Sequence, residues 1–331
     1  MSATLGGGGQ AAQDQLVTFS RRLLSRFRAE TVFNRWGKQD GIPRNGGRGI
    51  SFRGLTTIYP AGTAGSAAAA SAPSALTEGT FPTAIDATWR EVIATVSQYG
   101  QVMFITDLAE GQSIDPQIPN YVEAFSESMK DGMDLVTRDA LSAGTNVQYA
   151  SSAASRAQVG SGMYLNLAEL REAKRTLRRN NAKPVRSEGN KFVVITHTDA
   201  EFDLEGDSNL TNIWKDAGDR GMGNQLFDVS FKDLPLGFRL FGTTNARIYA
   251  SAGLSGADVY ATLVIGEEFY GTEKLSAMSA EVIVVRPDQA SLSNPLKQLG
   301  SVGWKSAHAA KVLDDANGVR IEHVCSTKNA A

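Results

Sequence analysis

Residues 120–144, NYVEAFSESMKDGMDLVTRDALSAG, are the stretch that decides the fold. Its apolar side chains recur at steps of three and four positions, which places them on one face of an α-helix. They are Val122, Phe125, Met129, Met133, Val136 and Ala140. Pro119 and Asn120 suit the start of a helix and Gly144 suits its end. The pattern predicts a long helix over 121–143, about 35 Å from end to end.

The patterns on either side of this helix predict an α+β fold. Residues 41–108 hold two extended runs around the small-residue stretch AGTAGSAAAASAPSA, which predicts a projecting antiparallel hairpin. A second helix is expected over 167–179 and a buried strand over 191–197. We expect an acidic loop over 199–219, and then mostly strands with one short helical candidate over 302–313. Helices therefore come early and strands late, without the βαβ alternation of a doubly wound sheet.

Composition indicates a large protein of the cell interior. The 331 residues are 42% hydrophobic and 21% charged, and a chain of this size buries roughly 75% of its unfolded surface. The single cysteine, Cys325, cannot form an internal disulfide, which fits a reducing cytosol. No signal peptide and no run of apolar residues long enough to span a membrane are evident, so we expect no membrane contact.

The sequence offers little for catalysis or for metal binding. No phosphate-binding loop, nucleophile elbow or zinc motif occurs. His197 beside Asp199 is the best candidate for a general base in a hydrolase, although a structural histidine at a strand end is the favoured interpretation. The acidic cluster of Asp203, Glu205 and Asp207 lacks the spacing of a calcium loop, and a solvated surface is favoured. We therefore expect no catalytic residues, no cofactor and no metal.

Charge is arranged in blocks of alternating sign. Residues 1–53 carry a net charge of +6, residues 100–140 carry −6, residues 171–191 carry +6 and residues 199–219 carry −6. A solvated face is the default for any single block. The set of four nevertheless favours contacts between subunits, because matched charges across an interface fix its register.

In the order of its parts, the chain resembles the major capsid proteins of tailed bacteriophages with the HK97-like fold, and among them the coat proteins of the N-four-type podoviruses. The resemblance covers about residues 16–325. It rests on RRLLSRF in an amphipathic stretch that starts near Leu16, on ALTEG followed by ATVSQYGQVMFITD, and on RDALSAGTNVQYA, LREAKRTLRRNNAKP, VYATLVIGEEFYG and NPLKQLGSVGWKSAHAAKVLDDANGVRIE.

The resemblance implies a division of the chain into four parts. They are an N-terminal arm (1–40), an extended loop (41–105), a peripheral domain (106–160 and 272–331) with the spine helix 121–143, and an axial domain (161–271). It also implies a structural protein and not an enzyme: a coat protein that assembles through pentamers and hexamers into the icosahedral head around double-stranded DNA. Arm and loop would lie across neighbouring subunits. An encapsulin-type compartment is the alternative within the same fold.

The implied partners are further copies of the chain, a separate scaffolding protein, the portal, a decoration protein and packaged DNA. A separate scaffold is expected because only some fifteen residues precede the amphipathic stretch that starts near Leu16. Assembly in the host bacterial cytoplasm and a final place in the virion are expected too. We expect the basic helix 167–179 to meet acidic protein surface first and DNA second. The candidates for the subunit interface are Arg21, Arg22, Arg26, Arg28, Arg44, Arg48, Glu78, Glu123, Glu127, Asp131, Asp134, Arg171, Lys174, Arg175, Arg178, Arg179, Asp203, Glu205 and Asp207.

Overall fold

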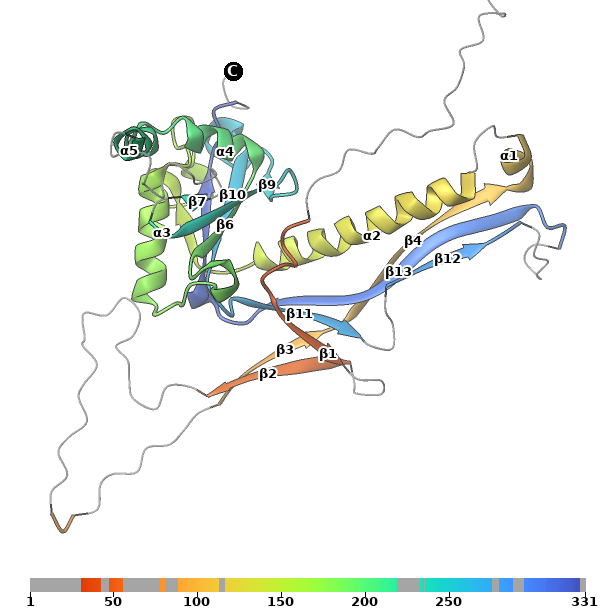
Figure 1. The fold of residues 1–331 in the computed structure, drawn as a ribbon, viewed down its shortest axis with the longest axis horizontal. Helices are drawn as coiled ribbons and strands as arrows, with labels where there is room; N and C mark the ends of the chain where they lie inside the picture. The colour runs from red at the N-terminus through yellow and green to blue at the C-terminus, as the bar shows by residue number, and fades with distance from the viewer. Residues whose placement is uncertain are drawn as a thin grey trace, which may run out of the picture.

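The computed structural model describes most of the chain in two connected parts, an elongated part and a compact body (Figure 1). The described residues are 31–42, 48–55, 78–80, 89–112, 117–218, 233–234, 236–275, 280–287 and 295–327. The arm pattern that starts near Leu16 lies outside them.

The elongated part is a long helix lying on a narrow antiparallel sheet. Helix α2 (Gln117–Leu141) covers strands β4 (Ser97–Thr106), β13 (Leu299–Val312) and β12 (Glu281–Val285). Ile118 of α2 is buried against Ile105 of β4 and Val302 of β13, and three further side chains of the helix, Tyr121, Val122 and Phe125, pack on this cluster. The predicted spine helix is therefore confirmed, with a start three residues before Asn120.

The compact body is built on a seven-stranded mixed sheet. Its strands lie in the order β5-β14-β10-β6-β8-β7, and β9 also pairs with β10. Helix α3 (Leu167–Arg179) packs on this sheet through the buried Leu170, Ala173 and Leu177, as predicted. The strands are β5 (Val147–Tyr149), β6 (Phe192–Thr196), β7 (Asp233–Leu234), β8 (Phe238–Gly242), β9 (Ile248–Tyr249), β10 (Val259–Ile265) and β14 (Gly318–His323).

Two further strands extend the elongated sheet, and a hairpin rests on it. Strands β2 (Gly49–Leu55) and β3 (Trp89–Thr95) pair antiparallel, which confirms the predicted hairpin. Strand β1 (Lys38–Ile42) runs parallel to β11 (Tyr270–Leu275), and β11 continues the elongated sheet along β13. The hairpin rests on β11, where a Cβ at Gly271 would meet the ring of Phe52 at 2.7 Å. A side chain at position 271 would therefore lift the hairpin from the sheet.

Two predictions of secondary structure were wrong. The segment 302–313 is not helical: residues 302–312 belong to β13, because their backbone groups pair with β4, β12 and β11. The expected loop over 199–219 contains helices α4 (Thr198–Glu205) and α5 (Ser208–Gly218). His197 accepts the Asp199 N–H at the start of α4, and Asp207 accepts the Asn209 N–H at the start of α5, so polar side chains that suggested a loop act as helix caps.

Strand pairing between distant parts of the sequence places strands of one expected domain segment in different parts of the structure. Strand β14 pairs with β10 inside the compact body, whereas β12 and β13 of the same C-terminal segment lie in the elongated part. Strand β4, expected within the extended loop, pairs along its whole length with β13. A short helix, α1 (Asp107–Gln112), follows β4 at the distal end. None of the described helices is long and apolar enough to cross a membrane.

Candidate assembly surfaces

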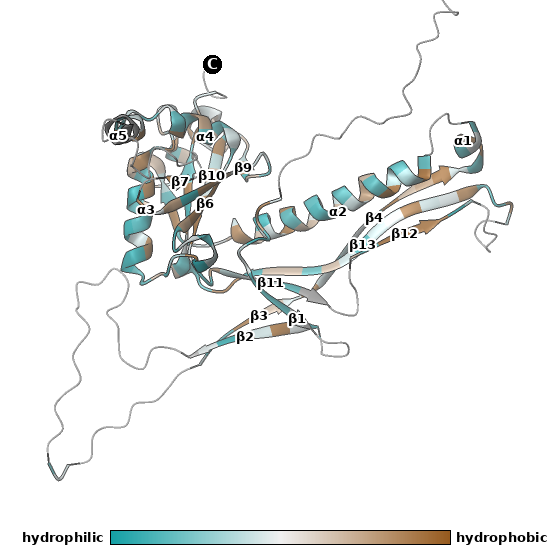
Figure 2. Cartoon of the chain, in the orientation of Figure 1, coloured by the Kyte–Doolittle hydropathy of each residue, from teal (hydrophilic) through white to brown (hydrophobic). Residues whose placement is uncertain are grey.

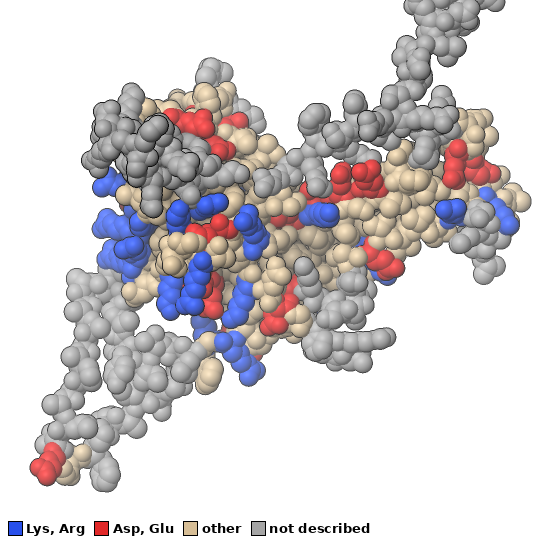
Figure 3. Space-filling view, in the orientation of Figure 1, with Lys and Arg blue, Asp and Glu red and all other residues tan. Residues whose placement is uncertain are grey.

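The outer face of α3 carries a cluster of exposed cations (Figure 3). Arg171, Arg175, Arg178 and Arg179 are exposed because the apolar stripe of the helix faces the sheet. Asn166 caps the helix by accepting the Glu169 N–H at 2.9 Å. No ion pair joins these four arginines to a carboxylate within the described ranges, which leaves their charge available to a partner.

Lys174 differs from the arginines beside it. It is half-buried, donates to the backbone carbonyl of Leu236, and lies 5.7 Å from the centre of the Phe238 ring. Burial, and then the nearby Arg178, lowers the pKa of Lys174. Its contacts within the chain make Lys174 a weaker candidate for an interface than its neighbours.

The acidic candidates on α2 are of two kinds. Glu123 is exposed, and Glu127 and Asp131 are half-buried. Asp134 is buried completely, and its two oxygens accept the backbone N–H groups of Val32 and Asn34, each at 3.1 Å. The expectation that Asp134 faces a neighbouring subunit is therefore wrong, because its charge already fixes the backbone of the same chain to the helix.

The acidic segment 199–219 shows a similar division. Asp203 accepts the N–H and the hydroxyl of Ser326, and Asp207 accepts the Leu167 N–H at 2.8 Å as well as capping α5. These two carboxylates hold neighbouring segments of the compact body together. Glu205 is exposed at the end of α4 and remains an interface candidate. No ion pair is formed between this segment and the cations of α3 among the residues that the structure describes.

The remaining candidates belong to the arm and the extended loop. Arg48 and Glu78 are described and exposed. Arg21, Arg22, Arg26, Arg28 and Arg44 lie outside the described residues.

Two buried polar joints connect the elongated part to the compact body, and neither was predicted. In the first, the buried Glu322 of β14 accepts both Arg156, at 2.6 and 2.7 Å, and Arg320, at 2.9 Å. Arg320 also donates to the carbonyls of Ser142 and Gly144, just after α2 ends. The only signal in the sequence was the charged pair inside the apolar run GVRIEHVC.

The second joint anchors residues 31–37. Beyond the two amides held by Asp134, the Trp36 indole donates to Glu188 at 3.0 Å, and Arg35 and Arg239 form ion pairs with the same carboxylate at 3.0 and 3.5 Å. The Trp36 ring also packs on Phe241, with 4.6 Å between the ring centres. This segment is thereby fixed to α2 at one end and to the compact body at the other.

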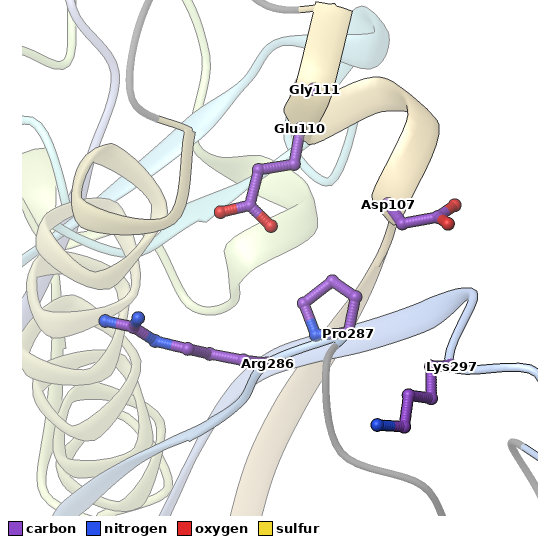
Figure 4. Close-up of a pocket in the computed structure, with 6 residues that line it drawn as sticks. All are labelled: Asp107, Glu110, Gly111, Arg286, Pro287 and Lys297. Carbon is purple, nitrogen blue, oxygen red and sulfur yellow. The ribbon is translucent and has the colours of Figure 1, made fainter.

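The distal end of the elongated part presents charges of both signs around a hollow of about 430 Å³ (Figure 4). Asp107 and Glu110 of α1 line one side, and Arg286 and Lys297 line the other. All four are exposed, and within the described part of the chain no ion pair links them. Exposed leucines lie close to them in the sequence, at Leu108, Leu296 and Leu299.

The described histidine and cysteine side chains with possible catalytic chemistry make packing or capping contacts. His197 Nδ1 accepts the Asp199 N–H at 3.1 Å, and its ring packs edge-on against Tyr260. His323 is fully buried, and burial lowers its pKa to about 4, which keeps it neutral. Burial also raises the pKa of the Cys325 thiol. No group of three metal-binding side chains occurs among the described residues.

Comparison with known proteins agrees with this architecture. A search of curated proteins gives no match. The capsid of Ralstonia phage GP4 is similar in structure, with a TM-score of 0.69, 12% identity and 98% of each chain covered. The capsid of cyanophage Pam1 has a TM-score of 0.68 and 13% identity, over 97% of this chain and 99% of that one. The capsid of cyanophage P-SCSP1u has a TM-score of 0.65 and 15% identity, over 95% and 94%.

These similarities over nearly whole chains confirm the HK97-like capsid fold. The sequence also matches the model of a family described as phage capsid protein, over residues 89–321. This match covers most of the chain and includes the hairpin strand β3, the spine helix α2 and most strands of the two larger sheets. The chain therefore belongs to the phage capsid protein family.

Proposed function

We propose that many copies of this chain, arranged as pentamers and hexamers, form the icosahedral head that encloses the double-stranded DNA of a tailed phage. The family match supports this assembly. The observation that carries the proposal is the shape of the chain: a compact body continues into a narrow helix-on-sheet part and a projecting hairpin. Such a shape leaves much surface to be covered by other subunits. The family match favours a phage head over an encapsulin-type compartment.

The partners of the head belong to the same proposal. A separate scaffolding protein would guide assembly in the host bacterial cytoplasm, the portal would occupy one vertex, and a decoration protein could bind outside. The assembled protein would be a component of the virion and would catalyse no reaction. His197 is consistent with this last point, because its ring nitrogen caps α4 and its ring packs against Tyr260. Purified shells are therefore expected to show no hydrolase activity that depends on His197.

Assembly of the purified protein tests the proposal directly. The chain is expressed without other phage genes, then viewed by negative-stain electron microscopy and weighed by light scattering. Closed shells of megadalton mass would support a coat protein that assembles without a scaffold. Monomers or capsomer rings that close into shells only with the neighbouring phage proteins would support a coat protein that needs one. A monomer that stays inert even with those proteins would contradict the proposal.

The cations of α3 are proposed to meet acidic surface of a neighbouring subunit, and packaged DNA only in second place. Their exposure and their lack of ion pairs within the described residues support a role outside the chain. Reversal of two charges, Arg175→Glu with Arg178→Glu, should lower the yield of shells several-fold. The control Arg175→Lys with Arg178→Lys keeps the charge and should assemble normally. Normal shells with poor DNA retention would instead assign this face to DNA.

A further inference from the structure

Glu273 lies where three elements of the elongated part meet. On one side of β11 it is registered with Asp40 of the parallel strand β1, and on the other side with Ala309 of β13. Figure 2 shows β1 and the hairpin strands β2 and β3 crossing near the end of β11. The ring of Phe52 lies over Gly271, two residues before Glu273, so Glu273 is on the face of the sheet that the hairpin covers.

The carboxyl group of Glu273 has no partner in this position. Its side chain is completely buried, and neither of its oxygens takes part in a hydrogen bond among the described residues. An ionised carboxylate is costly to bury without a partner, and like charges directly opposite each other on neighbouring strands repel. Because Asp40 is the residue directly opposite, the packed arrangement of β1, β11 and the hairpin favours a protonated Glu273.

The cations on this face of the sheet do not neutralise Glu273. They are Lys38 of β1, Lys311 of β13, and Arg48 and Arg90 of the hairpin. Two of them have carboxylate partners elsewhere: Lys38 lies 3.4 Å from Glu268, and Arg90 lies 2.9 Å from Asp314. Within the described ranges no cation forms an ion pair with Glu273, so an ionised carboxylate here would face only the like charge of β1.

The pKa of Glu273 is shifted in the direction that these contacts require. Burial, and then Asp40, raise the pKa to about 7, although the Ile50 amide acts in the opposite direction. In water the same carboxyl group has the ordinary pKa of 4.5. The packed arrangement is therefore favoured fully below about pH 4.5 and loses this advantage as the pH rises through 7.

We propose that Glu273 is a proton-dependent latch that closes β1 and the hairpin onto β11, so that loss of its proton releases these strands while the rest of the chain stays folded. The Arg90–Asp314 pair that also ties the hairpin is partly exposed, and an ion pair in contact with water contributes little. The pairing of β4 with β13 and the core under α2 do not include Glu273. Release therefore stops at these strands and frees the base from which the extended loop projects.

Hydrogen exchange followed by mass spectrometry tests the latch on the full-length protein. Exchange is measured at about pH 6 and pH 8, corrected for the intrinsic rate, at a concentration where light scattering gives the same mass at both pH values. Protection of residues 38–42 and 49–55 should fall about tenfold from pH 6 to pH 8, the ratio that follows from pKa values of 4.5 and about 7. Protection of β6 and α3 should stay unchanged.

Four variants show which group carries the response. Glu273→Gln keeps the shape of the side chain without its charge, so residues 38–42 and 49–55 should be equally protected at both pH values. Glu273→Met should do the same without a buried amide, should the glutamine destabilise the fold. Asp40→Asn should make the loss smaller, because the ionised carboxylate then faces no like charge. The matched control is Glu91→Gln on the outer side of the hairpin, 3.5 Å from Arg53, which should keep the wild-type response.

Three results would overturn the latch. Equal protection of residues 38–42 and 49–55 at both pH values in the wild type would show that no proton controls these strands. A wild-type response in Glu273→Gln and Glu273→Met would assign the control to another group. A loss of protection that extends equally to α3 and β6 would mean general destabilisation and not release of the hairpin. All three concern a single chain, so they are independent of whether the protein forms shells.

Discussion

Glu322 shows how a single carboxylate holds two parts of this chain together. It is completely buried, and it accepts Arg156 from the connection before α3 and Arg320 from its own strand. Arg320 then reaches the carbonyls at the end of α2. A buried carboxylate between two guanidinium groups adds little net stability when complete, but its removal leaves charges without partners.

Glu322→Gln should therefore lower the free energy of unfolding by about 3 to 5 kcal/mol, since two arginines lose their counter-charge in a buried site. Urea denaturation of the capsomer-sized or monomeric protein measures this change. Glu123→Gln, on the exposed face of α2, is the control and should change stability by less than about 0.5 kcal/mol. Equal stability of the two variants would contradict the role assigned to the joint.

Glu273 gives the chain a dependence on pH. Its side chain lies beneath the hairpin, it is fully buried, and neither carboxylate oxygen has a partner at ordinary hydrogen-bond geometry among the described residues. Burial, and then Asp40 on the neighbouring strand, raise its pKa to about 7, although the Ile50 amide acts in the opposite direction. The protonated form is therefore the one that suits the folded state.

The sign of the pH effect follows from this shift. The pKa of Glu273 in the folded state lies above the ordinary value of 4.5. The contribution of Glu273 to the free energy of unfolding is therefore fully present below about pH 4.5 and is lost as the pH rises through 7. At about 1.4 kcal/mol per unit, the change is roughly 3 kcal/mol. Unfolding free energies measured from pH 4.5 to 8 should fall for the wild type and stay flatter for Glu273→Gln. Parallel curves for the two proteins would rule out this residue as the cause.

At the scale of elements, the sequence pattern predicted those helices and strands whose buried face is set by the spacing of their own apolar residues. Helix α3 and strand β6 appeared at the expected positions because their apolar spacing alone defines a buried face. Strand β13 was mistaken for a helix because the alanines and lysines of KSAHAAKV favour helix, while the pairing that decides its structure comes from β4, β11 and β12, far along the chain.

For the candidate assembly surfaces too, exposure could be predicted only where it depends on the spacing of nearby residues. The exposure of Arg175 and Arg178 could be predicted, because the apolar stripe of α3 fixes which side faces solvent. The burial of Asp134 could not, because its partners are the backbone amides of Val32 and Asn34, about a hundred residues earlier in the chain. That Val102 of β4 and Ile283 of β12 lie on the same face of the sheet also could not be predicted without the strand register.

Two glycines of the elongated part should respond in opposite ways to substitution by alanine, one in a helix and one in a strand. A Cβ at Gly132 of α2 would meet the Trp304 ring at 3.6 Å, an ordinary contact, whereas one at Gly303 of β13 would come within 2.8 Å of the Gln101 carbonyl oxygen. Gly132→Ala should therefore stabilise the protein by up to about 1 kcal/mol, through helix propensity. Gly303→Ala should destabilise it by shifting the β4–β13 pairing. Thermal melts compare the two, and a destabilised Gly132→Ala would mean that α2 needs glycine for another contact.

At the scale of the whole molecule, the ends of the elongated part are made differently. The proximal end is tied to the compact body by the joints at Glu188, Asp134 and Glu322, all of them shielded from solvent. The distal end presents its charges to solvent in two patches, the acids of α1 and the cations around Pro287. A surface that carries both signs in separate patches can pair with the same surface of a second copy, acidic patch against basic patch, in a two-fold symmetric contact.

Paired charge reversal tests this pairing of the distal ends. Asp107→Lys with Glu110→Lys makes the end wholly basic, and Arg286→Glu with Lys297→Glu makes it wholly acidic, so either variant should lower shell yield through like-charge repulsion between copies. The chain with all four reversals restores opposite patches and should recover assembly, as should a mixture of the two double variants. Because exposed charges are screened by salt, the defects should shrink as NaCl rises from about 0.05 to 0.5 M. Light scattering and electron microscopy measure the yield. A mixture of the two double variants that assembles no better than either variant alone would show that these charges do not pair between copies.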